Sequence, residues 1–182
     1  MVTIPGSLAV NAGRCPGRVA VVFGERSCTY AEFDGAVNQA AHALAAAGLR
    51  QGDRMLLMSG NSDRFILALY AALRLGALVV PVNPASAAPE LQHILADSGA
   101  SLLVFGGGTQ SVVRAAGSFL DGSLAGPPIA LDPVEGYRNL PDLAADRPAT
   151  PPGVDVAESD DAVFVGPLRA PRLFRFHLKQ EK

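Results

Sequence analysis

A run of small residues in the middle of the chain could bind a phosphate. It reads G-G-G-T, from Gly106 to Thr109, between an apolar run at 101–105 and a segment with helical spacing. Backbone N–H groups of a glycine-rich turn at the start of a helix suit phosphate oxygens. The glycine spacing fits neither G-x-G-x-x-G nor the P-loop. Phosphate binding is therefore one interpretation, and a flexible turn, which we favour, is the other.

Metal-binding and nucleophilic residues are sparse. The histidines and cysteines are His42, His93, His177, Cys15 and Cys28. Their separation in sequence does not have the spacing of a metal site. The pair Ser59-Gly60 lacks the surrounding G-x-S-x-G of a nucleophile elbow. We therefore predict no catalytic, cofactor-binding or metal-ligating residue in this chain, and we expect both cysteines to be reduced thiols, as in cytosolic proteins.

The composition bounds the class of protein. Hydrophobic residues make up 49% of the 182 and charged residues 18%, which is typical of a globular domain. A formal net charge of −2 gives no electrostatic case for a nucleic-acid partner. No run of 18 apolar residues is present, so we expect no membrane span. The first 15 residues lack the features of a secretory signal, and we expect a cytoplasmic protein.

The C-terminal segment 166–182 differs from the rest in charge. Its five basic residues and one acidic residue give +4, which leaves −6 for residues 1–165. Its basic and aromatic residues at 169–179 could contact anionic lipid or nucleic acid. We favour a disordered or accidental tail, and we assign residues 1–165 to one α/β domain.

Local signals predict a hairpin and a long helix near the start. Runs at 19–23 and 26–30 flank Gly24, which suits a hairpin turn. Thr29 and Glu32 fit a capping box for a helix over about 31–47. Gly48 is expected to end that helix in the left-handed region. The side chains expected to be buried on one face are Phe33, Val37, Ala40, Ala41 and Leu44.

Strand and helix signals then alternate. Strands are predicted at 54–59, 77–82, 101–105, 127–131 and 162–165, and helices at 62–75, from 89 to about 99, and at 110–116. Asn61 is the expected cap of the second helix and Gly76 its end. Residues 132–153 contain five prolines and are predicted to be irregular. The alternation predicts an α/β fold, a mostly parallel sheet with helices on both faces.

Four segments in the same order resemble the N-terminal region of the acyl-CoA synthetases, which are adenylate-forming (AMP-binding) enzymes. They are P-G-R-V-A at 16–20, T-Y-A-E-F at 29–33, G-L-x-x-G-D-R at 48–54 and the block L-R-L-G-A-L-V-V-P-V-N-P at 73–84. Asp160-Asp161 resembles the D-D that introduces the strand before the family's nucleotide loop. In this reading Gly76, Val79 and Val80 have scaffold roles.

The resemblance implies a fatty-acid–CoA ligase. Such an enzyme uses ATP and Mg²⁺ to join a fatty or other carboxylic acid to AMP, and it then transfers the acyl group to coenzyme A. The family's phosphate loop, T-S-G-T-T-G, is not found in this sequence, which departs from the pattern after Val165. We therefore expect a truncated or frameshifted chain that binds no cofactor alone and is inactive in isolation.

Other interpretations stay open. The chain could be a non-catalytic binding or complementation module whose partner is a separately encoded remainder of the enzyme, or an independent nucleotide-binding α/β protein. The loop A-S-A-A at 85–88 also departs from the family, in which a threonine often caps the following helix. We expect this cap to fall to Ser86 or to be lost.

Overall fold

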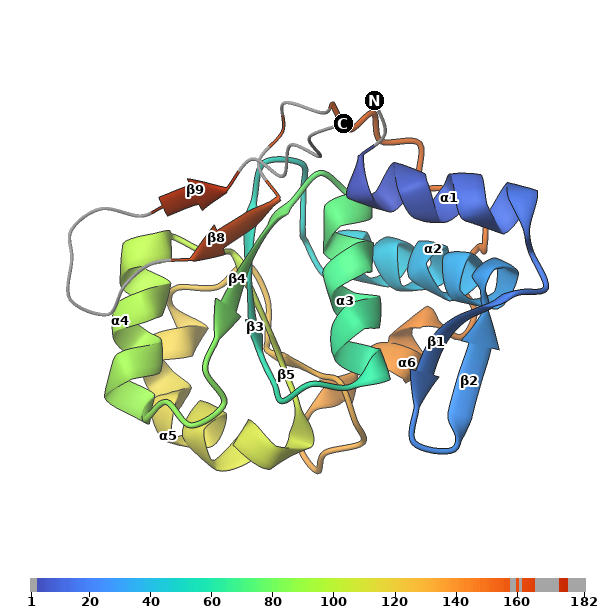
Figure 1. Cartoon of the computed structure of the whole chain (residues 1–182). Helices are drawn as coiled ribbons and strands as arrows, with labels where there is room; N and C mark the ends of the chain where they lie inside the picture. Colours follow the sequence, from blue (N-terminus) through green and yellow to red (C-terminus); the bar gives the residue numbers. More distant parts are fainter. Residues whose placement is uncertain (1–2, 158–159, 161, 166–173, 177–182) are drawn as a thin grey trace.

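The computed structural model describes residues 3–157, 160, 162–165 and 174–176 of the 182, with the backbone alone at 164–165 and 174–176 (Figure 1). The helices are α1 (Ile4–Arg14), α2 (Tyr30–Ala46), α3 (Asp63–Arg74), α4 (Ala88–Ser98), the 3-10 turn η1 (Gly107–Thr109), α5 (Gln110–Asp121) and α6 (Leu140–Ala144). The strands are β1 (Val19–Phe23), β2 (Arg26–Thr29), β3 (Arg54–Met58), β4 (Leu78–Val82), β5 (Leu102–Phe105), β6 (Ile129–Ala130), β7 (Arg138–Asn139), β8 (Val163–Val165) and β9 (Phe174–Phe176).

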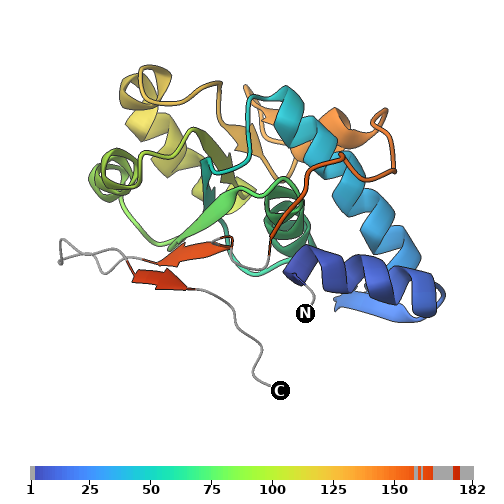
Figure 2. The same cartoon turned by 90° about the horizontal axis from the view of Figure 1, so that it is seen from above.

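The main sheet has the strand order β7-β6-β5-β3-β4-β8-β9. All neighbouring pairs from β7 to β8 are parallel, and β9 runs antiparallel to β8. Helices α2, α3 and α6 pack on one face of this sheet, and α4 and α5 pack on the other (Figure 2). This arrangement confirms the predicted α/β fold.

The two faces of the sheet carry separate cores. Leu57 and Val79 belong to the cluster under α2 and α3, whereas their neighbours Leu56 and Val80 belong to the cluster under α4 and α5. Side chains of a strand alternate between faces, so a strand covered on both sides must be apolar at every position. The continuous apolar runs of the sequence therefore correspond to strands buried on both faces.

The hairpin and the first long helix form as predicted. Strands β1 and β2 pair antiparallel, and Gly24 in their turn has φ +60°. The capping box is complete, because Thr29 N–H donates to Glu32 Oε2 at 2.8 Å and Glu32 N–H donates to Thr29 Oγ1 at 3.3 Å. Gly48 follows the helix with φ +107°. All five side chains predicted for the inner face of α2 are buried.

The predicted cap of α3 is wrong by one residue, whereas the cap of α4 is lost, which is one of the two outcomes expected for it. Ser62, and not Asn61, caps α3, since its Oγ accepts from Phe65 N–H at 3.0 Å. A serine one residue later places its oxygen at the third N–H of the helix that forms, which is the favoured N-cap geometry. Helix α4 has no side-chain cap, because its N-cap position is Ala87 and Ser86 is buried one residue too early.

The sequence patterns missed or shortened several elements. Helix α1 was not expected, although Thr3 caps it and Pro5 stands in its first turn. Helix α5 continues to Asp121, five residues beyond the predicted end. The segment 132–153 is not wholly irregular, because β7 and α6 lie within it. There Asn139 caps α6 by accepting from Asp142 N–H at 3.0 Å.

The C-terminal tail is described only in part. Phe174–Phe176 form β9, and the rest of 166–182 lies outside the described residues, as do His177 and most of the basic and aromatic run. The expectation of disorder there stays a prediction. Within the described part of the chain, no helix combines the length and the hydropathy needed to span a membrane.

Candidate functional site

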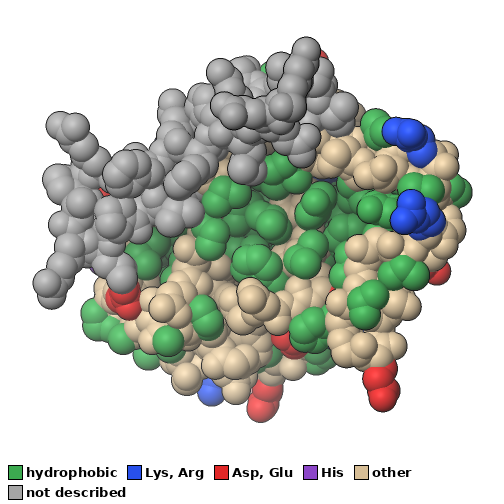
Figure 3. Space-filling model, viewed as in Figure 1, with side chains coloured by type: hydrophobic (Ala, Val, Ile, Leu, Met, Phe, Trp, Pro, Cys, Tyr) green, Lys and Arg blue, Asp and Glu red, His purple; other side chains and the backbone are tan. Residues whose placement is uncertain are grey.

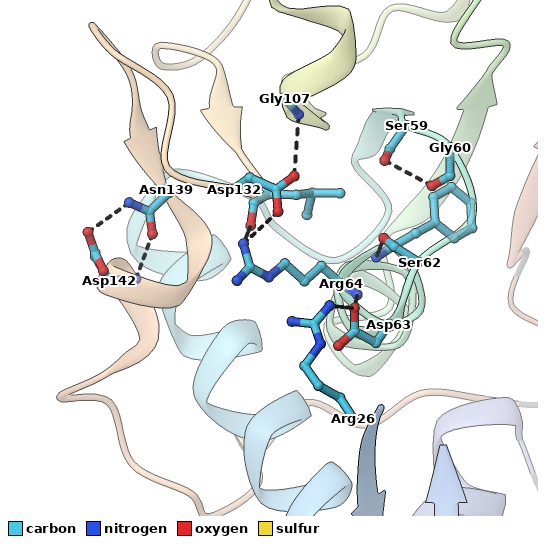
Figure 4. A network of polar contacts seen from close by, with 12 residues as sticks. Arg26, Ser59, Gly60, Ser62, Asp63, Arg64, Gly107, Asp132, Asn139 and Asp142 are labelled. Carbon is cyan, nitrogen blue, oxygen red and sulfur yellow. Dashed lines mark hydrogen bonds and ion pairs between the residues drawn. The ribbon is translucent and has the colours of Figure 1, made fainter. Parts of the chain in front are cut away.

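The carboxyl ends of β3, β5 and β6 meet at one edge of the sheet. The chain leaves β3 toward α3 on one face and leaves β5 toward η1 and α5 on the other face. Loops that diverge in this way open a crevice outside the strand ends, where ligands bind in many α/β sheets. A ligand site of this sheet would therefore be expected at this edge (Figure 4).

Arg64, in the first turn of α3, occupies the centre of this edge (Figure 4). Its Nη1 donates to Asp132 Oδ1 at 2.6 Å and to Leu131 O at 3.1 Å. The other carboxylate oxygen, Asp132 Oδ2, accepts from Gly107 N–H at 3.3 Å. The three contacts tie the start of α3 to the residues that follow β6 and β5.

A second ion pair lies beside the first. Arg26 of β2 donates to Asp63 Oδ1 at 2.9 Å, and Asp63 is the first residue of α3. Both pairs are partly exposed, and such pairs each contribute about 0–1 kcal/mol to stability. Two cations matched by two carboxylates leave no net charge among these four side chains to attract a charged substrate.

The G-G-G-T turn packs closely against neighbouring residues, and the Gly107 N–H and the Thr109 hydroxyl have partners within the protein. A Cβ on Gly106 would lie 2.5 Å from Ser59 Oγ, so the turn packs directly against the residue after β3. The Thr109 hydroxyl is buried and donates to Gly106 O at 2.8 Å. Gly107 N–H already serves Asp132, whose carboxylate would repel a phosphate. The residues here do not fit a triphosphate, and the structure favours the interpretation of a turn with a structural role.

The remaining candidate residues are not brought together. His42 Nε2 lies 3.0 Å from Thr150 O, and His93 is exposed on α4. Cys15 and Cys28 are both free thiols. The pKa of Cys28 is raised, mainly by burial and secondarily by the nearby Glu32 carboxylate. Among the described residues, no group of three or more His, Cys, Asp or Glu side chains could hold a metal ion.

Sequence patterns did not single out Arg64 or Asp132. They are 68 positions apart, and neither belongs to a motif with fixed spacing. Asp132 directly follows the apolar run of β6, so a polar residue at the carboxyl end of a strand was the only local signal.

Comparison with known proteins decides the family. A sequence model of the AMP-binding enzyme family matches residues 8–165. The chain belongs to the AMP-binding enzymes. The resemblance inferred from the four sequence segments is therefore confirmed, and the matched range covers every described element from β1 to β8.

The AMP-binding relatives include acid–CoA ligases. The long-chain-fatty-acid–CoA ligase FadD13 of Mycobacterium tuberculosis is 34% identical over 137 residues, which are 75% of this chain and 26% of that protein. A feruloyl-CoA synthase of Amycolatopsis is 42% identical over 100 residues, which are 54% of this chain and 20% of that protein. The chain thus spans about a fifth to a quarter of the length of these relatives.

Solved AMP-binding structures have the same arrangement of strands and helices. The N-terminal domain of FACL13 from Mycobacterium tuberculosis superposes with a TM-score of 0.80 at 30% identity, over 90% of this chain and 41% of that one. A fatty acyl CoA synthetase from the same organism gives the same TM-score and identity, with 32% of its chain covered. The fold described here is thus found within the N-terminal region of fatty acyl-CoA ligases.

Proposed function

We propose that this chain is the N-terminal scaffold of a fatty-acid–CoA ligase and that it does not catalyse the reaction alone. The complete enzyme would activate a fatty or other carboxylic acid with ATP and Mg²⁺ as an acyl adenylate, and coenzyme A would then displace AMP to give the thioester. The scaffold contributes the parallel sheet and its two cores. The groups that bind the triphosphate of ATP would come from polypeptide other than these 182 residues.

The observation that carries this proposal is that the chain matches only a part of each related enzyme. It matches relatives over 20–26% of their length. Its sequence has no T-S-G-T-T-G segment, and in the glycine-rich turn that could replace it the Gly107 N–H and the Thr109 hydroxyl are engaged within the protein. The charged residues at the sheet edge are paired with one another, Arg64 with Asp132 and Arg26 with Asp63, and do not form an arrangement that would activate a nucleophile or a base.

The test is an acyl-CoA synthesis assay on the purified 182-residue chain with ATP, Mg²⁺, CoA and a long-chain fatty acid. We expect no thioester above a blank without protein. Turnover by a preparation free of host ligases would contradict the proposal. The FadD13 ligase, assayed in parallel, is the positive control for the reagents.

Complementation by a separate polypeptide is the alternative that the same observation favours. The probe is the part of FadD13 that follows its matched quarter, produced separately and mixed with this chain. Restored thioester synthesis in the mixture alone would support a complementation module. Calorimetric titration with ATP tests the remaining alternative: measurable binding would favour an independent nucleotide-binding protein, and a flat titration would exclude it.

A further inference from the structure

Residues 147–157, here called the strap, contain no helix or strand and belong to the connection between α6 and β8 (Figure 2). Side chains of α2 donate to its backbone. Gln39 Nε2 donates to Arg147 O at 3.1 Å, Asn38 Nδ2 donates to Ala149 O at 2.7 Å, and His42 Nε2 contacts Thr150 O at 3.0 Å. The strap is largely exposed and has no ladder of its own, so these side-chain contacts hold carbonyls that would otherwise bond to water.

A contact with Arg74 fixes the orientation of the Asn38 side-chain amide. Asn38 is 1% exposed, and its Oδ1 accepts from Arg74 Nη1 at 2.6 Å. Arg74 also donates to Asp34 Oδ1 at 2.7 Å and to Pro5 O at 3.1 Å. Because the amide oxygen must face the guanidinium, the amide nitrogen must face Ala149 O. The strap is thereby joined to α1, α2 and α3 at one buried point.

A second anchor lies outside α2. Gln51 Nε2 donates to Asp155 O at 2.8 Å. The side chain of Gln51 passes over Gly76, where a Cβ would lie 2.8 Å from Gln51 Cγ. Gly76 thus leaves room for the side chain that holds the strap, in addition to ending α3 with φ +66°.

Strand β8 follows the strap in the chain and lies beside β4 in the sheet. It is three residues long, and Val79↔Val163 is its register pair with β4. Val79 N–H donates to Ala162 O at 3.0 Å, whereas the neighbouring Leu78 N–H donates to Asp53 O, on the β3 side, at 2.8 Å. Strand β8 also pairs with β9 on its other side, but it meets β4 at this one register position, so few hydrogen bonds hold it to the parallel part of the sheet.

We propose that Gln39, His42 and Gln51, with Asn38 behind them, are positioning residues that hold β8 in the sheet by fixing the strap. This inference goes beyond the proposed function, because it concerns the placement of β8 and stands or falls independently of the ligase reaction. In the family that the sequence resembles, this strand precedes the nucleotide loop, so the same contacts would set where such a loop begins.

The test compares amide hydrogen exchange at Val79, which reports on β8, and at Leu78, which reports on β3. The variant Gln39→Ala/His42→Ala/Gln51→Ala removes three contacts to the strap and leaves buried Asn38 intact. We expect the Val79 amide to exchange about tenfold or more faster, since one such hydrogen bond changes an opening equilibrium about fivefold. The Leu78 amide is expected to keep its rate.

The matched control is Gln110→Ala/His93→Ala, which removes an exposed glutamine and an exposed histidine on α5 and α4 and should change neither amide. Equal acceleration at Val79 and Leu78 would mean that the contacts stabilise the whole fold and do not position β8 in particular, which would contradict the proposal. No change in the exchange rate of Val79 would also contradict it. If the triple variant does not fold, single variants should each accelerate Val79 about twofold to fivefold. His42→Gln, which keeps an N–H donor, should then restore protection lost in His42→Ala.

Discussion

Gly76 combines two constraints that no other residue type satisfies together. Its φ of +66° is strained for a residue with a Cβ, and that Cβ would meet Gln51 at 2.8 Å. Gly117, inside α5, has neither constraint, because nothing lies within 4 Å of its added Cβ and its backbone is helical. The two glycines should therefore respond oppositely to the same substitution.

We predict that Gly76→Ala destabilises the fold by about 1 kcal/mol from the left-handed backbone, with a further loss from displacing Gln51. Gly117→Ala should instead stabilise the fold by about 0.5–1 kcal/mol, since alanine is the better helix former. Urea unfolding of both variants and the wild type provides the measurement. Shifts of the same sign in the two variants would contradict the argument.

The capping box of α2 should make stability depend on pH. Thr29, through its backbone N–H first and its hydroxyl second, holds the pKa of the exposed Glu32 below its usual value. The contribution of the carboxylate is therefore complete above the unfolded pKa, about 4.3, and is lost as the pH falls through the lower folded value.

The expected result is that wild type exceeds Glu32→Gln in stability near pH 7 and that this difference shrinks from about pH 5 downward. The amide of the variant does not titrate, so it isolates the charge. Urea unfolding of both proteins at several pH values measures the difference. A difference that stays constant over the whole range would show that the charge of Glu32 has no role.

At the scale of elements, the structure depends on strands that are covered on both faces. Val79 is 0% exposed under α3, and Val80 is 4% exposed under α4, although they are neighbours in sequence. Val22, on the two-stranded hairpin, is 67% exposed. The same deletion of two methyl groups should therefore have different consequences in the sheet and in the hairpin.

Val79→Ala and Val80→Ala should each destabilise the fold by about 1–3 kcal/mol, through lost burial and the cavity left behind. Val22→Ala, the matched control, should stay within about 0.5 kcal/mol of wild type. Chemical denaturation resolves these differences. If one sheet variant were neutral, the helix on that face would not pack as closely as the structure has it.

The molecule as a whole presents apolar side chains across one face, over α3 and β4 (Figure 3). Helix α3 carries Ile66, which is 36% exposed, beside the half-buried Phe65 and Leu69. Contiguous apolar surface of this kind promotes association in water. A scaffold that works within a larger enzyme would bury such a face against the remainder.

We predict that the isolated chain associates increasingly with concentration and that Ile66→Glu shifts the equilibrium toward monomer. Sedimentation velocity at two concentrations about tenfold apart measures this shift. Gln110→Glu adds the same charge at an exposed position of α5 and is the control. An equal shift in both variants would assign the effect to net charge and not to the apolar face.

The sequence predicted the elements whose signals are local. Thr29 and Glu32 are three residues apart, and the inner face of α2 repeats every three or four residues, so both could be read without a partner segment. Helix α6 was missed because Pro141 suggested a break, although proline is tolerated in a first turn when a residue such as Asn139 caps it. The same tolerance applies to Pro5 in α1.

By itself, then, the sequence determined the alternation of strands and helices, the two-sided burial of the sheet and the family. Only the tertiary structure decided that Arg64 meets Asp132, that Asn38 holds Ala149, and that Gln51 crosses Gly76 to reach Asp155. Hydrophobic periodicity relates residues that are only a few positions apart, so it can be read directly from the sequence. A contact between segments far apart in sequence exists only once the sheet has fixed the distance between them, so no local pattern predicts it.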